Sequence, residues 1–448
     1  MRFNKFSRAL QGILAVSFLT ASPAAVRPAA AGTEKVLYSF TDGADGGYSQ
    51  AGLIADKDGN LYGTTLSGGV SCELFGGCGT VFRLSRAKGG GLTLTVLHTF
   101  AGFPTDGEAP SGGLVFDAEG NLYGTTTLGS SQFSALDNGT VFELTPTKSG
   151  EWTETILHNF GGGNDGVFPY SNLVFDQAGN LYGTTNSGGG GTNSTFCTNG
   201  CGTVFELSPQ GNGQWTETIL HTFPQGGGGS PDGQNPYAGV VFDSAGNLYG
   251  TTYYGGPDDA GTVFRLGRQN GQWKETGLFA FRGELNSDPK GNNPYAGVMV
   301  DGSGNIFGTT AGGGNSRGDG VVFELSPGST GKYQETVIHV LGDPRYVDGE
   351  LPYTAVVMDA VGNLYGATSD GGGENLPTCP DYDGCGVVFK LAPNANGSWS
   401  ETILYAFTGG SDGGFPEDDR LLLDPAGEIL GTTHSGGDGF GVIFAIKP

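Results

Sequence analysis

The heptapeptide GNLYGTT, residues 59–65, decides the fold because near-copies of it recur along the whole chain. Identical copies occupy residues 120–126, 179–185 and 246–252. Three drifted copies follow, GNIFGTT from Gly304, GNLYGAT from Gly362 and GEILGTT from Gly427. The chain after its N-terminal segment therefore divides into seven units of about 60 residues, a period typical of folds in which every unit is one supersecondary structure.

Each unit contains four short apolar runs separated by turn signals. In the fourth unit the runs are AGVVFD (238–243), NLYGTT (247–252), GTVFRL (261–266) and WKETGLFAF (273–281). The first two are joined by a D-x-x-G turn, in which Asp bonds the backbone two residues on and Gly accepts a positive φ. No segment shows a sustained helical period. The pattern predicts an all-β, seven-bladed β-propeller with four antiparallel strands in each blade.

The two ends of the chain predict how the ring closes. The run EKVLYSF, which begins at Glu34, matches the fourth strand of a unit, whereas the final GVIFAIKP matches the third. Residues 36–40 are therefore expected to pair with residues 442–446 and complete the last blade, which removes two open sheet edges. On this interpretation residues 34–448 form a single propeller.

Residues 1–31 have the composition of a signal peptide. Arg2, Lys5 and Arg8 precede an apolar run over residues 9–21, and small residues end at Ala31. The run is short for a membrane span, although an uncleaved N-terminal anchor is the alternative. We expect export, to the periplasm or the extracellular space, and no transmembrane segment after removal of the signal peptide.

Composition narrows the classes of partner. The formal net charge of −24 disfavours nucleic acid and anionic membranes, because an acidic surface repels phosphate. The 86 glycines alone would suit a disordered chain, but an aromatic content of 11% indicates a substantial core. We expect an ordered monomer that binds a glycan or a protein ligand.

The six cysteines fall into three close pairs, which predict local disulfides in an exported chain. No histidine lies near any pair, which disfavours zinc. The pairs are Cys72 with Cys78, Cys197 with Cys201, and Cys379 with Cys385.

No metal site and no cofactor are assigned from the sequence. His98, His158, His221 and His339 share one position of the fourth strand, where other units carry Tyr or Phe, and this interchange favours packing over metal binding. Calcium is the alternative, because the segment DKDGN at Asp56 resembles the opening of a calcium loop. It lacks the later bidentate Glu.

The loops from strand four to strand one, and from strand two to strand three, must emerge on the same face of a propeller. The first class reads G-G-x-D-G-x-x-P and supplies five candidate ligand-binding acids, Asp106, Asp165, Asp232, Asp348 and Asp412. The second class varies in length, and its three longest members contain the cysteine pairs. Variable loops on one rim of a regular scaffold are typical of binding surfaces.

Tyrosine follows the proline of the first loop class in four successive units. We predict that these tyrosines stack on sugar rings or anchor a peptide, and the alternative is that each fills a corner between blades. The other units have Gln50, Ser111 and Glu417 at this position, so the ring is asymmetric. The predicted binding residues are Tyr170, Tyr237, Tyr295 and Tyr353.

A secreted hydrolase or lyase acting on polysaccharide is the rival hypothesis, and a purely structural surface protein is a third. The acids recur as turn partners of glycine, and the chain has no zinc signature. No catalytic residue is therefore assigned, and enzyme activity remains the less favoured interpretation. A purely structural role does not explain the uneven distribution of the tyrosines.

The repeated unit as a whole resembles the choice-of-anchor tandem repeat proteins of the GloVer type. The motifs that carry the resemblance are W-x-E-T-I-L-H-x-F, G-G-x-D-G-x-x-P, D-x-x-G-N-L-Y-G-T-T and G-T-V-F-x-L. The resemblance covers residues 34–448 and implies an exported bacterial protein without an established reaction. Many relatives carry a C-terminal anchoring module, and this sequence shows none after Pro448, which favours release or periplasmic retention. The strand-one and turn pattern is also similar to NHL-type propellers, which are mainly interaction scaffolds.

Overall fold

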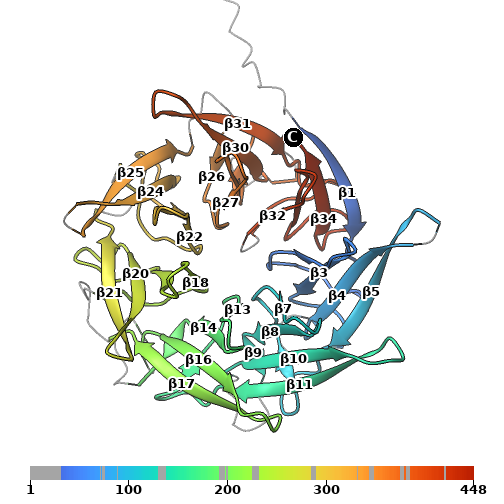
Figure 1. The fold of residues 1–448 in the computed structure, drawn as a ribbon. Coiled ribbons are helices and arrows are strands. Elements are labelled where there is room, and N and C mark those ends of the chain that lie inside the picture. The colour runs from blue at the N-terminus through green and yellow to red at the C-terminus, as the bar shows by residue number, and fades with distance from the viewer. Residues whose placement is uncertain are drawn as a thin grey trace, which may run out of the picture.

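The computed structural model describes residues 32–448 except 71, 73–75, 88, 130–137, 191–196, 198–199, 225–231, 284–288, 330, 343–347, 374–377, 380–383 and 418–419. The described residues form seven four-stranded antiparallel sheets arranged in a ring (Figure 1). This confirms the predicted all-β, seven-bladed propeller. The predicted signal peptide, residues 1–31, lies outside the described residues.

Every blade runs from a two-residue strand at the axis to a long strand at the circumference (Figure 1). The innermost strands are β2 (Ile54–Ala55), β7 (Val115–Phe116), β13 (Val174–Phe175), β18 (Val241–Phe242), β22 (Met299–Val300), β27 (Val357–Met358) and β32 (Leu422–Leu423). The second strands are β3 (Leu61–Thr65), β8 (Leu122–Thr126), β14 (Leu181–Thr185), β19 (Leu248–Thr252), β23 (Ile306–Thr310), β28 (Leu364–Thr368) and β33 (Ile429–Thr432).

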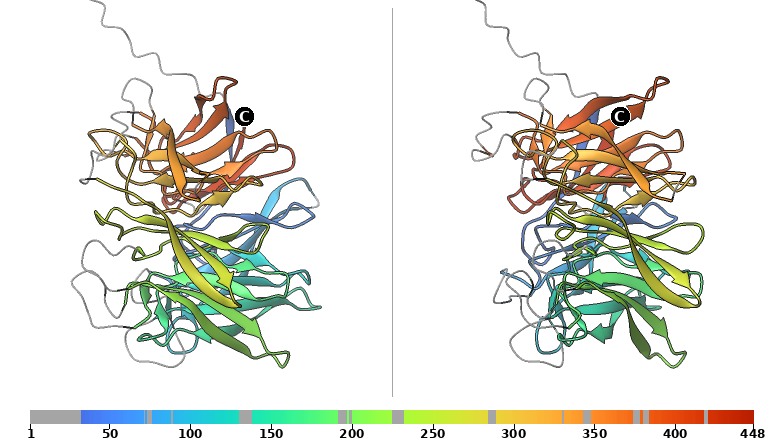
Figure 2. Two further views of the ribbon diagram at one scale, coloured as in Figure 1. Left: turned by 60° about the vertical axis from the view of Figure 1, so that its left-hand side comes forward. Right: turned by 90° about the vertical axis from the view of Figure 1, so that its left-hand side faces the viewer.

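The third and fourth strands form the outer hairpins, which Figure 2 shows from the side. The third strands are β4 (Thr80–Arg86), β10 (Thr140–Pro146), β16 (Thr203–Pro209), β20 (Thr262–Gln269), β24 (Val321–Pro327), β30 (Val387–Pro393) and β34 (Val442–Lys447). The fourth strands are β5 (Leu92–Thr99), β11 (Trp152–Asn159), β17 (Trp215–Thr222), β21 (Gln272–Ala280), β25 (Tyr333–Val340), β31 (Trp399–Ala406) and β1 (Thr33–Ser39). Three further two-stranded sheets lie outside the blades: β6 (Gly107–Glu108) with β9 (Leu128–Gly129), β12 (Gly166–Val167) with β15 (Ser187–Gly188), and β26 (Gly349–Glu350) with β29 (Asp370–Gly371).

The ring closes as predicted, because the first strand of the chain is the outer strand of the last blade. β1 pairs antiparallel with β34, with Val36 opposite Phe444 and Tyr38 opposite Ile443. The unpaired residue between them, Leu37, forms a bulge. The Thr432 hydroxyl completes the seam with a 3.0 Å hydrogen bond to Ser49, 383 residues away in sequence.

The glycine of the repeated LYGTT lies under an aromatic ring. Gly63 is paired with Phe82 of the neighbouring strand, and a Cβ on Gly63 would lie 2.6 Å from the Phe82 ring. Only glycine leaves room for this ring, which is fully buried. The same arrangement recurs at Gly124, Gly183, Gly250, Gly308 and Gly366.

The two threonines of LYGTT hold neighbouring elements together. The Thr64 hydroxyl donates to the Pro110 carbonyl of the next blade (3.1 Å). The Thr65 hydroxyl lies 2.9 Å from that of Thr80 within its own blade. Each copy of the motif thus supplies one hydrogen bond along the blade and, where the first threonine is kept, one between blades.

The turn before LYGTT is closed by its aspartate. Asp56 accepts backbone N–H bonds from Asp58 and Asn60 (both 2.9 Å) and side-chain bonds from Asn60 (2.7 Å) and Tyr62 (3.0 Å). Burial alone would raise the pKa of Asp56, but these hydrogen bonds outweigh it and lower the pKa. The recurrence of D-x-x-G-N-L-Y is therefore turn chemistry, as the sequence predicts.

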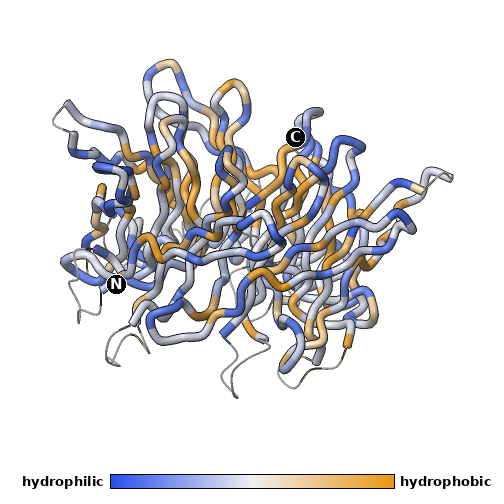
Figure 3. Tube along the Cα trace, turned by 60° about the horizontal axis from the view of Figure 1, so that its bottom comes forward, coloured by the Kyte–Doolittle hydropathy of each residue, from blue (hydrophilic) through white to orange (hydrophobic). Residues whose placement is uncertain are grey.

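Adjacent blades meet through phenylalanines at the end of the fourth strand. Phe100 packs edge-on against Phe142 of the next blade, with ring centroids 5.2 Å apart. Equivalent pairs occur at five other junctions, and Leu341 replaces the phenylalanine at the seventh. Apolar residues consequently follow the strands, whereas polar residues gather in the turns and loops (Figure 3).

Candidate binding site at the channel mouth

The loop from strand four to strand one enters the channel mouth through a residue with positive φ in every blade. Such a conformation costs about 1–2 kcal/mol for a residue other than glycine. Phe168 shows how it is held: its N–H donates to the Asn138 carbonyl of the preceding blade, and its carbonyl accepts from Asn186 (both 3.0 Å). The seven residues are Tyr48, Ala109, Phe168, Asn235, Asn293, Leu351 and Phe415, with φ between 54° and 59°.

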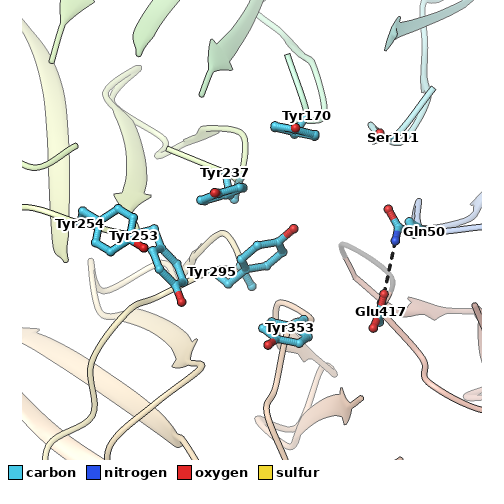
Figure 4. Close-up of a pocket in the computed structure, with 11 residues that line it drawn as sticks. Gln50, Ser111, Tyr170, Tyr237, Tyr253, Tyr254, Tyr295, Tyr353 and Glu417 are labelled. Carbon is cyan, nitrogen blue, oxygen red and sulfur yellow. Dashed lines mark hydrogen bonds between the residues drawn. The ribbon is translucent and has the colours of Figure 1, made fainter. Parts of the chain in front are cut away.

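This pair of backbone bonds recurs at all seven positions, so the mouth is a rigid ring. Two residues further along each loop, one side chain per blade reaches the axis. These side chains surround a cavity of about 390 Å³ together with Ala238, Ala296 and two further tyrosines, Tyr253 and Tyr254. The ring consists of Gln50, Ser111, Tyr170, Tyr237, Tyr295, Tyr353 and Glu417 (Figure 4).

The four predicted tyrosines form a continuous arc on one side of the mouth (Figure 4). Tyr237 stacks on Tyr295 with centroids 4.8 Å apart, and Tyr295 meets Tyr353 edge-on at 4.9 Å. Tyr170 lies 5.8 Å from Tyr237. All four are half-buried, so each ring packs on its neighbour and still presents surface to the cavity.

The other side of the mouth is polar. The Gln50 amide donates to Glu417 (3.3 Å) across the seam of the ring. Burial, reinforced by the charge of Asp370, raises the pKa of Glu417 to about 7. Burial also raises the pKa values of Tyr170, Tyr237 and Tyr295, which keeps their hydroxyls protonated and able to donate.

A second cavity of about 450 Å³ adjoins the first and shares Gln50, Ser111 and Tyr170 with it. Its wall includes Leu66, Leu128 and the ring of His434, which lies 5.0 Å from Tyr48. Burial lowers the pKa of His434, so the imidazole is neutral at pH 7. The mouth therefore combines an aromatic and a more apolar compartment.

The five predicted binding acids do not line the tyrosine cavity. Asp106 and Asp348 are buried and face the histidine of the preceding fourth strand, His98 at 3.3 Å and His339 at 3.2 Å. Asp165 lies 3.4 Å from His158, Asp412 accepts from the Tyr405 hydroxyl (3.0 Å), and Asp232 acts electrostatically on His221. The structure places all five at the junctions between blades, and their role in ligand binding stays a prediction.

A glutamate from the next blade completes three of these junctions. The clusters are His98–Asp106–Glu154, His158–Asp165–Glu217 and His339–Asp348–Glu401, and within each cluster one ligand atom per residue lies within 4.8 Å of the others. The donor types in each cluster suit a divalent cation. The histidines lie far from one another, but each of these three has two carboxylate partners of its own. The expectation of no metal site is therefore untested.

Within these clusters the pKa values of the glutamate and the aspartate shift in opposite directions. Burial and the nearby Asp106 raise the pKa of Glu154. The pKa of Asp106 is lowered, because hydrogen bonds from His98 and Ala101 outweigh its burial. Burial lowers the pKa of His158, but Asp165 and Glu217 outweigh this effect and raise it.

All three predicted disulfides are present, with Cα–Cα distances of 5.2, 5.1 and 5.8 Å. They pack on the mouth loops of the following blade. A Cβ on Gly102 would lie 3.0 Å from the Cys72 sulfur, and the Cys201 carbonyl accepts a hydrogen bond from Asn235. The disulfides therefore support the loops that present Ser111, Tyr237 and Glu417.

Sequence reasoning missed three features of the site. Tyr253 and Tyr254 follow LYGTT directly and are the only such pair in the seven copies, which was a usable signal. The partner role of Glu154 was hidden, because it needs the packing of one blade on the next. The third feature is Arg420, which lines a further cavity beside the inner strands; its placement there needs the register of those strands.

The chain belongs to the family described as the Gloeobacter/Verrucomicrobia repeat, whose model matches residues 24–197 and 191–444. No curated protein matches the chain. The described residues contain no helix that could span a membrane.

The solved structures that match the chain share little sequence identity with it. An ancestral GH74 enzyme shares 13% identity with a TM-score of 0.54, covering 90% of this chain and 47% of that one. PorZ, a surface component of the type-IX secretion system of Porphyromonas gingivalis, shares 16% identity with a TM-score of 0.47, covering 88% and 46%. A Lactobacillus plantarum protein shares 15% identity with a TM-score of 0.45, covering 79% and 84%. The chain thus spans about half the length of the first two, and the similarity concerns the fold alone.

Proposed function

We propose that this chain is an exported binding protein that holds a glycan at the tyrosine arc of its channel mouth. The observation that carries the proposal is the arc itself: four half-buried rings from four successive blades lie side by side against an open cavity. Aromatic faces of this kind stack on the apolar faces of sugar rings, and the tyrosine hydroxyls and the Gln50–Glu417 pair supply hydrogen bonds.

Rigidity of the mouth favours binding as well. The positive-φ residues are fixed by backbone bonds to two blades, so little conformational entropy is lost when a ligand enters. The three disulfides constrain the neighbouring loops in the same way and suit an oxidising compartment, in accord with export.

Polysaccharide hydrolysis is the second candidate, and Glu417 is the observation that favours it. A buried carboxyl with its pKa raised to about 7 has the property of a general acid. Two-carboxylate glycosidase chemistry needs a second acid across the sugar. Among the described residues that line the cavity, Glu417 is the only acid, so we place binding first.

The test is a screen of the full chain on glycan and peptide arrays, followed by three variants. Tyr237→Ala and Tyr295→Ala are expected to weaken capture of a glycan at least tenfold with nearly unchanged melting temperature. Tyr237→Phe is the matched control, because it keeps the stacking ring. A large fall in melting temperature with capture retained would show that the tyrosines only fill corners between blades. Release of reducing sugar from a captured polysaccharide would select the hydrolase.

A further inference from the structure

The channel continues below the tyrosines into a third cavity of about 410 Å³. Ala238 and Ala296 line the upper cavity, and the residues that follow them, Gly239 and Gly297, line the lower one. The lower wall is formed mostly by the inner strands β13, β18, β22 and β27, which contribute apolar side chains and backbone. The two cavities are thus successive levels of one channel.

Arg420 lies in this lower level and is the only charged residue among the described residues that line it. It precedes β32 and forms a backbone bridge with Ala355 of the preceding blade. Its side chain extends beside Gly52 of the next blade, where a Cβ would lie 3.3 Å from the Arg420 Cγ. The equivalent residues of the other blades carry no charge: Gly52, Gly113, Asn172, Gly239, Gly297 and Ala355.

The guanidinium of Arg420 is exposed to the channel and has neither an ion pair nor a hydrogen bond to any residue that the structure describes. Because Arg420 is exposed, water solvates its guanidinium until a ligand takes the place of that water. Its planar fork of donors matches a carboxylate or a sulfate group. The net charge of −24 repels an anionic ligand. Arg420 therefore supplies the local attraction that such a ligand needs inside the mouth.

We propose that the channel selects a saccharide that carries a carboxylate or sulfate group, with a sugar ring on the tyrosine arc and the anionic group directed down to Arg420. This inference rests on the proposed function and names its ligand class. The arc supplies affinity for a ring of any charge, whereas Arg420 supplies the preference for an acidic one. Glu417 opposes an anion only when it is ionised, and its raised pKa of about 7 limits that repulsion at neutral and acidic pH.

The experiment compares matched pairs of saccharides on the full chain: oligogalacturonate with its methyl ester, and sulfated with desulfated galactan and chondroitin fragments, immobilised beside neutral oligosaccharides and acidic peptides. The acidic saccharides are expected to be retained at least tenfold better than their neutral counterparts, and the gap is expected to close in high salt. Which of the two acidic series binds better identifies the anionic group.

Arg420→Gln is expected to remove the preference, lowering affinity for the acidic member of a pair about tenfold and leaving the neutral member unchanged. Lys57→Gln is the matched control, because it removes the same charge from a surface turn where the side chain is 87% exposed. The esterified and desulfated saccharides test the inference without any substitution, so a folding defect in Arg420→Gln would not decide it.

The two levels of the proposal fail separately. Equal retention of acidic and neutral saccharides, or unchanged affinity in Arg420→Gln, would overturn the role of Arg420 while the tyrosine site stands. Retention of acidic peptides in preference to every saccharide would overturn the ligand class. Retention that survives Tyr237→Ala and Tyr295→Ala would instead overturn the proposed function.

Discussion

The blade junctions and the channel mouth both vary from blade to blade, but at two of the junctions the change is compensated by neighbouring residues. Three junctions hold a histidine between an aspartate and a glutamate. At the junction where Phe279 replaces the histidine, Lys290 replaces the aspartate and lies 3.5 Å from Glu335. A cation is therefore kept beside the glutamate, although it comes from another position.

The seam between the last and first blades is compensated in a different way. Tyr38 replaces the histidine and donates to Asp45 (3.0 Å), and Leu94 takes the sequence position of the glutamate, so no second carboxylate needs a cation. At the mouth the opposite holds, since four tyrosines gather on one side and Gln50 and Glu417 on the other. Compensated variation preserves the ring, and the variation without compensation lies at the proposed ligand site.

The largest effect that tests this comparison is expected from Asp348→Ala. The side chain is 1% exposed, faces His339 and accepts the Gly349 N–H, so its loss leaves buried partners unsatisfied. We expect a loss of about 3 kcal/mol in the free energy of unfolding, measured by denaturant titration. Asp58→Ala, at a side chain that is 67% exposed, is the control and is expected to change it by less than about 0.5 kcal/mol.

The next effect tests compensation directly at the junction of Phe279 and Lys290. Lys290→Asp places a carboxylate near Glu335 without a cation and is expected to cost about 2 kcal/mol. Adding Phe279→His rebuilds the histidine cluster of the other blades and is expected to recover most of that loss. A double-mutant cycle measures the coupling, and strictly additive effects would show that the two positions vary independently.

Stability is expected to fall as the pH rises from about 5 to 9. The folded state raises the pKa of Glu34 and of Glu275 to about 7, mainly by burial, and also raises those of Glu154 and Glu217. A raised pKa favours the folded state below the unfolded value of 4.5 and loses this contribution as the pH passes the folded value. The lowered pKa values of Asp106 and Asp165 act oppositely and destabilise the fold below about pH 4.

The maximum of stability therefore lies in mildly acidic solution, and we expect a difference of at least about 1 kcal/mol between pH 5 and pH 9. Thermal unfolding across this range measures it. Glu154→Gln combined with Glu217→Gln should flatten the alkaline slope, because an amide imitates the protonated carboxyl. An unchanged slope in this variant would place the origin of the pH dependence elsewhere.

The smallest effect on stability is expected at the mouth. Gln50→Ser removes the hydrogen bond that lowers the pKa of Glu417, so that pKa should rise further, with the free energy of unfolding changed by less than about 0.5 kcal/mol. Titration of the Glu417 carboxyl by NMR measures the shift. A marked loss of stability would mean that the mouth is constrained like the junctions.

The fold was predictable because local sequence and global architecture agree at each repeated position. Gly63 is required by the Phe82 ring, Asp56 by its turn, and Thr64 by the next blade, so every copy of GNLYGTT reports the same contacts. The seam was predictable from the offset of β1 alone. The tyrosine arc was predictable because tyrosine follows the loop proline in four successive units, and successive units are neighbours in the ring.

The remaining parts of the site depend on packing between units, which a linear pattern does not contain. Glu154 and His98 are 56 residues apart and meet only because consecutive blades stack. The recurring Asp106 position suggested ligand binding because loops usually carry function, whereas its carboxylate is engaged inside a junction. The sequence alone does not show that Arg420 lies in the channel, because its position there depends on the backbone bridge to Ala355.

The offset of β1 has a consequence for how such a ring can grow. The ring is closed by the pairing of β1 with β34, which come from opposite ends of the propeller. No interior unit contributes to this pairing. Duplication or loss of a whole interior repeat would change the number of blades but leave the pairing of β1 with β34 unaltered. A ring closed in this way could gain or lose a blade without any change in the strand pairing that closes it.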